Sequence, residues 1–168
     1  SLPEMIDRMA KMYAPVAKAC HEMGRPLGIE NHGDFYCSDL VELCARTPHM
    51  NIFLDTGNTY LIGEKSIPAC REAAPYTIGT HFKDHCVHPD PGTLMFVIEG
   101  APLGVGHVGL REVYDVLLKH APNPDKLVMH HSRHQQGGHQ DQPHQRERGV
   151  PQVGGHHRVH RRRVRAPD

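Results

Sequence analysis

Three residues that can bind a metal ion each end an apolar run of the sequence. Glu30 and Asp55 supply carboxylates after two such runs, and His81 supplies an imidazole after a third. Buried strands of a parallel sheet are apolar, and their carboxyl ends meet at one edge of the sheet. We therefore expect these three side chains to lie close together.

Two carboxylates and one imidazole form a hard ligand set made mostly of oxygen. Mn²⁺ and Mg²⁺ suit such a set, Co²⁺ also fits, and Zn²⁺ can be held by it. A pair of buried carboxylates is unfavourable without a positive charge, and a divalent cation removes that cost. Any one of these residues alone is more often an ordinary loop side chain. Together, Glu30, Asp55 and His81 predict a single divalent metal site.

Strands and helices alternate along residues 1–130. Strands are predicted at 26–30, 50–55, 77–81 and 126–129, and helices from Ser1 to Gly24 and at 38–46, 66–73 and 110–120, with Ser38 as the cap of the second. A hairpin is expected from 94–98 and 102–105. This alternation predicts an α/β fold with a parallel sheet. Because a (β/α)8 barrel needs eight strands and about 250 residues, four repeats make about half of a barrel.

The first predicted helix has an apolar stripe and an internal proline. Pro15 is expected to kink this helix. The stripe recurs at helical spacing and predicts one buried face, made of Met5, Ile6, Met9, Tyr13, Val16, Ala17 and Cys20.

The composition changes sharply after residue 130. Residues 1–130 hold 11 Lys/Arg and 16 Asp/Glu, a net charge of −5, whereas residues 131–168 hold 8 Arg and 3 acids, a net charge of +5. The later segment is rich in His, Arg, Gln and Gly and is too poor in apolar residues to offset its ordering entropy. We expect a partial barrel at 1–130 and a disordered basic tail at 131–168. A shifted reading frame is one hypothesis for this tail.

The cysteines and the hydropathy bear on location. The five cysteines include no CxxC pair, which favours reduced thiols and a cytoplasmic protein over a disulfide framework. No apolar run approaches the roughly 20 residues that cross a bilayer. The arginine run near the end lacks interleaved aromatic residues, so a nucleic-acid partner is not expected.

Four short motifs resemble the xylose-isomerase-like TIM barrels, the sugar phosphate isomerases and epimerases. They are Ile29-Glu30-Asn31-His32, Leu54-Asp55-Thr56-Gly57-Asn58, His81-Phe82-Lys83-Asp84 and Pro102-Leu103-Gly104-Val105-Gly106. The resemblance covers residues 1–130 and corresponds to the second half of the barrel. Inosose dehydratase and dehydroshikimate dehydratase are relatives within this family.

The resemblance implies a metal site with four ligands, of which three fall on Glu30, Asp55 and His81. In the epimerases, two glutamates also move a proton beside the substrate carbonyl through an enediolate, while the metal polarises oxygen. Glu30 matches the first of these glutamates. His130 stands where the second should be, and it can bind metal or carry a proton. The resemblance therefore predicts Glu30 and His130 as the catalytic pair, and it suggests that the natural end of the protein is missing.

Three further residues are candidates for binding substrate. His32 lies two residues beyond Glu30 and is either a substrate contact or a plain loop histidine. Asn58 stands where several epimerases carry a substrate-binding histidine, which weakens assignment as a ketose epimerase. Lys83 and Asp84 can bind a substrate anion and orient His81, or they can pair with each other on the surface. No role is assigned to Asn31 or His107.

Taken together, these features predict a metal-dependent sugar or sugar phosphate isomerase or epimerase. Its partners would be a small sugar or polyol substrate and a second copy of the chain, with no membrane. One alternative is a lyase that dehydrates a cyclic polyol or keto acid after the same proton abstraction. Another is an inactive fragment with a basic tail, since half a barrel leaves its sheet edges open.

Overall fold

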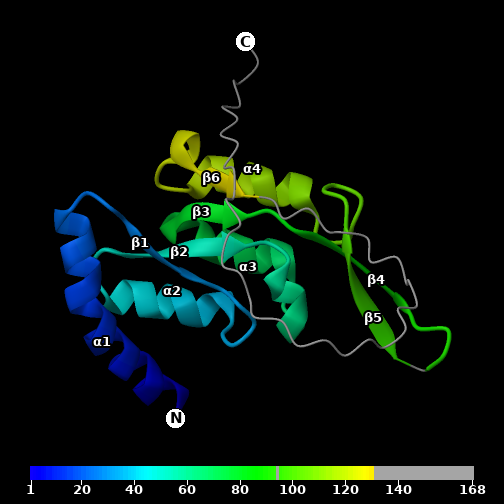
Figure 1. Cartoon of the computed structure of the whole chain (residues 1–168), viewed down its shortest axis with the longest axis horizontal. Helices are drawn as coiled ribbons and strands as arrows, with labels where there is room; N and C mark the ends of the chain where they lie inside the picture. The colour runs from blue at the N-terminus through cyan, green and yellow to red at the C-terminus, as the bar shows by residue number, and fades with distance from the viewer. Residues whose placement is uncertain (94, 131–168) are drawn as a thin grey trace, which may run out of the picture. The chain divides into compact units, whose positions relative to one another are not determined.

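The computed structural model describes residues 1–93 and 95–130. The helices in this part are α1 (Leu2–Glu22), α2 (Cys37–Arg46), α3 (Ser66–Ala73) and α4 (Leu110–His120). The strands are β1 (Leu27–Glu30), β2 (Met50–Asp55), β3 (Thr77–His81), β4 (Asp84–Pro89), β5 (Phe96–Ala101) and β6 (Val128–His130) (Figure 1). The tail that composition predicts to be disordered lies outside the described residues.

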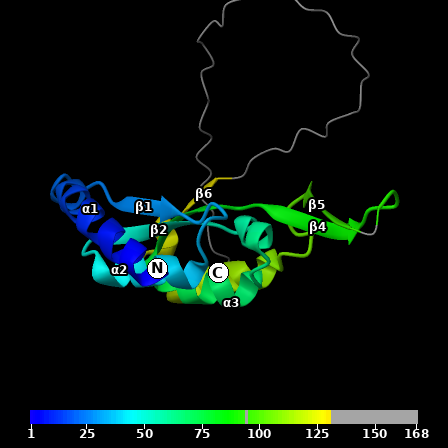
Figure 2. The same ribbon diagram turned by 90° about the horizontal axis from the view of Figure 1, so that it is seen from below.

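Strands β1, β2, β3 and β6 form one sheet in that order, and each neighbouring pair is parallel. The register places Glu30 beside Phe53, and it places Asp55 beside His81, which in turn lies beside His130. The α-helices lie along one face of this sheet (Figure 2). The predicted α/β class with a parallel sheet is confirmed.

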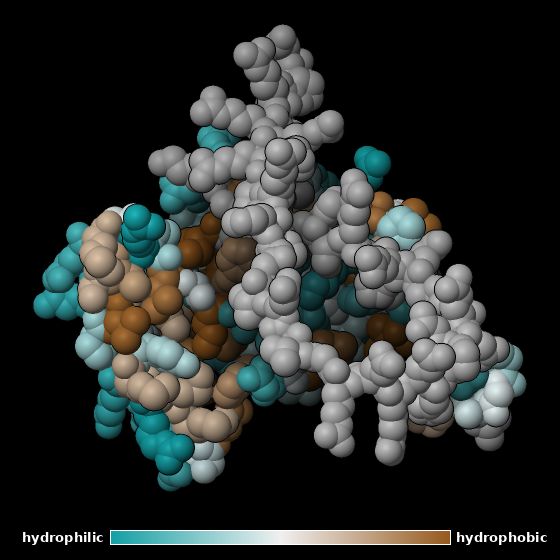
Figure 3. Space-filling view, viewed as in Figure 1, coloured by the Kyte–Doolittle hydropathy of each residue, from teal (hydrophilic) through white to brown (hydrophobic). Residues whose placement is uncertain are grey.

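The alternation of β2 explains why the helices cover only one face. Met50, Ile52 and Leu54 are buried in the core with the helices, and burying each such side chain stabilises the fold by about 1.5–3 kcal/mol. The residues between them, Asn51 and Phe53, are half-buried and belong to the opposite face. Figure 3 shows hydrophobic surface over β1 and β2 on this face. Asp55 follows Asn51 and Phe53 in this alternation, so its side chain also points away from the helices.

Helix α1 begins at the predicted Ser1 cap, but its buried face differs from the prediction. Its buried side chains are Ile6, Ala10 and Ala17, while Met5 and Val16 are 38% and 49% exposed. The helix packs against α2, β1 and β2, and this contact selects a narrower face than the whole apolar stripe. Pro15 lies inside this helix, and the kink expected there stays a prediction.

The start of α2 also differs from the prediction. Its cap is Tyr36 instead of Ser38, because the carboxylate of Asp39 accepts the Tyr36 N–H at 3.0 Å. The carboxylate of Glu64, far along the chain, accepts the Cys37 N–H at 3.0 Å. Carboxylates satisfy the free N–H groups of a first helical turn in this way. Two acidic side chains, one of them distant in sequence, therefore fix where α2 begins.

A hairpin is present near the predicted place, but the prediction paired the wrong segments. Strand β5 pairs antiparallel with β4, from Asp84 beside Ala101 to Pro89 beside Phe96. The sequence Asp90-Pro91-Gly92 lies in the intervening turn, and such residues favour tight turns. The prediction missed β4 because its sequence, DHCVHP, has no regular alternation of apolar residues. Phe96 at the end of the hairpin is 72% exposed.

Two further features concern the described residues only. No helix among residues 1–93 and 95–130 is long and apolar enough to cross a membrane. All five cysteines are free thiols, of which Cys37, Cys44 and Cys70 are buried.

Candidate metal site

Glu30, Asp55 and His81 lie together at the carboxyl ends of β1, β2 and β3. One ligand atom from each lies within 4.8 Å of the other two. Asp55 is fully buried, while the side chains of Glu30 and His81 are 30% and 29% exposed. The parallel register brings the three strand ends to one edge. The group is therefore open to solvent on the side of Glu30 and His81.

The two oxygens of Asp55 have different surroundings. Oδ1 accepts the backbone N–H groups of Gly57 at 2.9 Å and Asn58 at 3.2 Å. Oδ2 is buried and accepts no hydrogen bond from a described residue. The ammonium of Lys83 lies 2.5 Å from Oδ2 as an ion pair without hydrogen-bond angles. A buried oxygen of this kind calls for a strong positive ligand, so Oδ2 is the Asp55 atom best placed to bind a metal.

The tight turn after Asp55 needs a glycine. A Cβ on Gly57 would lie 2.4 Å from Nε2 of His85 and 2.8 Å from Cβ of Lys83. Without a side chain, Gly57 leaves room for His85 and Lys83 to pack against this turn. The N–H groups of Gly57 and Asn58 hold Oδ1 of Asp55, which leaves Oδ2 facing Glu30 and His81.

Asn31 holds the ends of β1 and β2 together. Its amide donates to the backbone oxygen of Asp55 at 2.9 Å and accepts the Asp55 N–H at 2.7 Å. The side-chain amide thus replaces one residue of strand pairing beyond Glu30. The side chain of Asn58 donates to the backbone oxygen of Asn31 at 2.9 Å. Glu30 and Asp55 are held side by side because the buried Asn31, next to Glu30 in sequence, bonds to both backbone groups of Asp55.

His81 turns one ring nitrogen toward both carboxylates. Its Nδ1 lies 3.0 Å from Oε1 of Glu30 and 3.6 Å from Oδ2 of Asp55. The ring of Phe53 meets the imidazole edge to face, with centroids 4.8 Å apart. A Cβ on Gly79 would lie 2.6 Å from the Phe53 ring, so this glycine makes room for it. Nδ1 is therefore the nitrogen that can bind an ion shared with Glu30 and Asp55.

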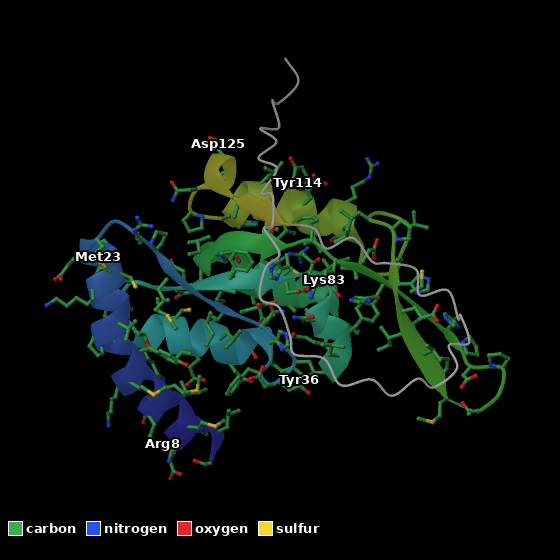
Figure 4. All side chains as sticks on the ribbon, viewed as in Figure 1. Arg8, Met23, Tyr36, Lys83, Tyr114 and Asp125 are labelled. Atoms are coloured by element: carbon green, nitrogen blue, oxygen red, sulfur yellow. The ribbon has the colours of Figure 1, made fainter. Side chains whose placement is uncertain are left out.

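The backbone of Lys83 is fixed by Thr56. The buried hydroxyl of Thr56 accepts the Lys83 N–H at 2.9 Å and donates to the Lys83 oxygen at 2.8 Å. The Thr56 N–H also donates to the His81 oxygen at 3.0 Å. Figure 4 shows Lys83 where the parallel sheet gives way to the β4–β5 hairpin. This backbone position directs the ammonium to Asp55.

Asp84 holds the loop of the PLGVG motif against the end of β3. Its carboxylate accepts backbone N–H groups at 2.9–3.2 Å, from His85, Gly104, Gly106 and Val108. Tyr60 adds a bond from its hydroxyl to the His107 oxygen at 2.6 Å. Burial, and then the nearby Asp84 charge, raise the pKa of Tyr60. These bonds hold the loop at residues 102–108 in place next to Asp84, the residue that follows Lys83.

The remaining predicted residues lie at the same end of the sheet. His32 is exposed just beyond β1. Asn58 is buried, and its amide is engaged with the Asn31 backbone as described above. His130 ends β6 beside His81 in the register, which places its backbone next in order after the three ligands. Their roles in substrate binding and catalysis stay predictions.

Several positioning residues carried no clear signal in the sequence. Asn31 adjoins a predicted ligand, which marked its place but not its role. Thr56 and Asp84 bond to backbone groups more than 19 residues away along the chain. Such partners can be known only once the strands are paired.

A cavity of about 440 Å³ lies at the other end of the sheet. Pro26 and His49, which precede β1 and β2, are among its lining residues. None of the three grouped ligands lines it. The group of Glu30, Asp55 and His81 is the better candidate site, because binding a metal ion requires such side chains and this cavity does not contain them.

Comparison with known proteins agrees with this architecture. A family model described as xylose isomerase-like TIM barrel matches residues 1–149. The chain belongs to this family, and its parallel sheet is part of a (β/α)8 barrel. No curated protein matches the sequence.

Three solved structures share the fold with this chain. A xylose isomerase domain protein from Planctomyces limnophilus matches with a TM-score of 0.58 and 20% identity, over 74% of this chain and 45% of that one. A xylose isomerase-like TIM barrel protein from Mycobacterium smegmatis, in complex with magnesium, matches with 0.59 and 19%, over 76% and 44%. The probable 3-DHS dehydratase AsbF of Bacillus anthracis, involved in petrobactin synthesis, matches with 0.53 and 16%, over 77% and 50%. The chain therefore spans at most half the length of each of these structures.

Proposed function

We propose that this chain carries the metal-binding half of an isomerase or epimerase that acts on a small sugar or sugar phosphate. The observation that carries the proposal is the convergence of Glu30, Asp55 and His81 within 4.8 Å at the edge of a parallel sheet. Such edges hold the active sites of (β/α)8 barrels. The family includes isomerases, epimerases and dehydratases.

A divalent cation, when bound, would hold substrate oxygens and stabilise negative charge beside the carbonyl. Oδ2 of Asp55 and Nδ1 of His81 would be two of its ligands, because Nδ1 lies 3.0 Å from Oε1 of Glu30 and 3.6 Å from Oδ2 of Asp55. Mg²⁺ and Mn²⁺ suit this mixture of two carboxylates and one imidazole. A structural neighbour contains magnesium, which supports the same choice.

Glu30 is the residue that we assign to proton transfer. Its carboxylate is partly exposed and therefore reachable by a substrate, whereas Asp55 is buried. A general base must lie within hydrogen-bond reach of the proton that it removes. His130, on the next strand end, is the candidate for the second proton carrier in place of a glutamate. Lys83 and His32 are the candidates for binding substrate oxygens at this rim.

Metal binding provides the direct test, because the three candidate ligands all lie within the described residues. The wild-type chain and its Asp55→Asn and Glu30→Gln variants would be titrated with Mn²⁺ and followed by calorimetry. We expect Asp55→Asn to weaken binding by at least about 100-fold, since it removes a charged ligand. Asp90→Asn, in the turn between β4 and β5, is the matched control and should bind as the wild type does. Unchanged affinity in Asp55→Asn would refute the site.

Proton exchange tests the chemistry. Ketoses incubated in D₂O with the Mn²⁺-loaded protein should gain deuterium beside the carbonyl, and Glu30→Gln should abolish this gain. A dehydratase begins with the same proton abstraction but then loses water. The formation of an unsaturated product from a cyclic polyol or keto acid would therefore favour the dehydratase. The similarity in fold to a probable dehydratase is the reason to include this assay.

A further inference from the structure

Lys83 and a divalent ion would need the same oxygen of Asp55. Oδ1 of Asp55 already accepts two backbone N–H groups, from Gly57 and Asn58. Oδ2 is left for other partners, and the Lys83 ammonium lies 2.5 Å from it. Asp55 is fully buried, and a buried carboxylate requires a compensating positive charge. In the absence of an ion, Lys83 supplies that charge.

The position of Lys83 is built by residues on both sides of its backbone. Thr56 bonds to its N–H and to its oxygen. The next residue, Asp84, is fixed by backbone N–H groups of the loop that follows β5. The backbone is thus held, while the Lys83 side chain remains 29% exposed and carries a flexible four-carbon stem. The ammonium can therefore move without disturbing the sheet.

We infer that Lys83 is a built-in counter-cation of Asp55 that a divalent ion displaces on binding. This inference rests on the proposed function, because it takes the ion to bind at Glu30, Asp55 and His81. An ammonium and a divalent cation on one oxygen repel each other strongly at a buried position. The released ammonium stays at the rim of the same site, held there by its fixed backbone. The Lys83 ammonium is therefore available to an anionic substrate group only when the metal is bound.

Two consequences follow for metal binding. The ion must replace an existing ion pair, so the wild-type affinity is lower than the bare ligand set would give. Removing the Lys83 charge should therefore strengthen metal binding, although the residue lies within the site. The Lys83 side chain should also become more mobile when metal binds, whereas an ammonium that merely shared Oδ2 would stay fixed.

Calorimetric titration with Mg²⁺ tests the first consequence. Lys83→Met should bind Mg²⁺ at least about tenfold more tightly than the wild type, whereas Lys83→Arg, which keeps the charge, should bind no more tightly. Lys65→Met removes the same charge from an exposed lysine at the start of α3 and should change affinity by less than about twofold. Unchanged or weaker binding in Lys83→Met would overturn the inference.

The second consequence is measured in the wild-type chain. Lysines labelled with ¹³C at Cε give signals whose relaxation reports mobility, and the Lys83 signal is identified by its loss in Lys83→Arg. We expect the Lys83 signal to be restricted without Mg²⁺ and to become as mobile as that of Lys18, an exposed lysine of α1, at saturation. A Lys83 signal that stays restricted would overturn displacement.

The two measurements also separate this inference from the proposed function. If Mg²⁺ binds, and Asp55→Asn abolishes binding, while Lys83 stays restricted, only the displacement is wrong. If the wild type and Lys83→Met both fail to bind Mg²⁺, the metal site and the displacement are refuted together.

Discussion

The side chain of Asn31 makes hydrogen bonds that a backbone would otherwise make in strand pairing. Its amide donates to and accepts from the backbone of Asp55, which extends the pairing of β1 with β2 by one position. Both bonds are buried, so neither Asp55 backbone group has water as a substitute partner. The bonds place one candidate metal ligand, Asp55, next to the other, Glu30. A residue outside the group of three therefore determines the geometry of the pair.

Asn31→Ala should lower the free energy of unfolding by about 2–4 kcal/mol, because it leaves a buried N–H and a buried carbonyl without partners. It should also weaken Mn²⁺ binding, since Asp55 loses its support beside Glu30. Urea denaturation and calorimetry measure the two effects. Asn123→Ala is the control and should change neither quantity. Asn123 is exposed and lies just before the 3₁₀ turn Pro124–Lys126 that follows α4. Wild-type stability in Asn31→Ala would show that the amide is dispensable.

At the scale of elements, the sequence predicted the parallel strands and the proximity of Glu30, Asp55 and His81. The apolar runs that end in Glu30, Asp55 and His81 were sufficient, because burial on one face and a charged end are both local patterns. The hairpin was paired wrongly because β4 is neither apolar nor regularly alternating. The sequence offered Asp84 as a partner of His81 or Lys83 and not as the residue that holds a later loop, since its backbone partners there lie about 20 residues further along. Bonds of this kind depend on tertiary structure.

The loop held by Asp84 gives a prediction at this scale. A Cβ on Gly106 would lie 2.3 Å from Oδ1 of Asp84 and 2.6 Å from the backbone oxygen of His85. Gly106→Ala should therefore separate the loop from β4 and destabilise the fold by at least about 2 kcal/mol. Thermal unfolding measures the loss, and limited proteolysis should cut the loop near Val105.

Gly92→Ala is the matched control for Gly106→Ala. A Cβ on Gly92 would meet only Oδ1 of Asp90, at an ordinary 3.5 Å. This variant should unfold at the wild-type temperature and resist proteolysis as the wild type does. Equal stability of the two alanine variants would mean that the loop adjusts to a side chain at Gly106.

At the scale of the whole described part, the core lies on one side of the sheet, between the strands and the helices. Buried thiols are part of this core, and their burial is unfavourable for a thiolate. Burial raises the pKa of Cys44 from 9.0 to about 12. Burial, and then Glu64 and Asp55, raise the pKa of Cys70 to about 12. Burial likewise raises the pKa of Cys37, with Glu64 adding to it.

These pKa values predict a loss of stability at alkaline pH. Below about pH 9 the thiols are protonated in both states and the full stability remains. Above it the unfolded chain releases protons that the folded chain keeps, so the free energy of unfolding falls until about pH 12. Each thiol contributes a slope of about −1.4 kcal/mol per pH unit in this range.

Urea denaturation at pH 8, 9, 10 and 11 measures the total slope. Cys44→Ala should make the slope shallower by the contribution of one thiol. The control Val116→Ala removes buried apolar volume without a titrating group, so it should lower stability equally at every pH. A Cys44→Ala slope equal to that of the wild type would show that this thiol ionises as readily in the folded chain as in the unfolded one.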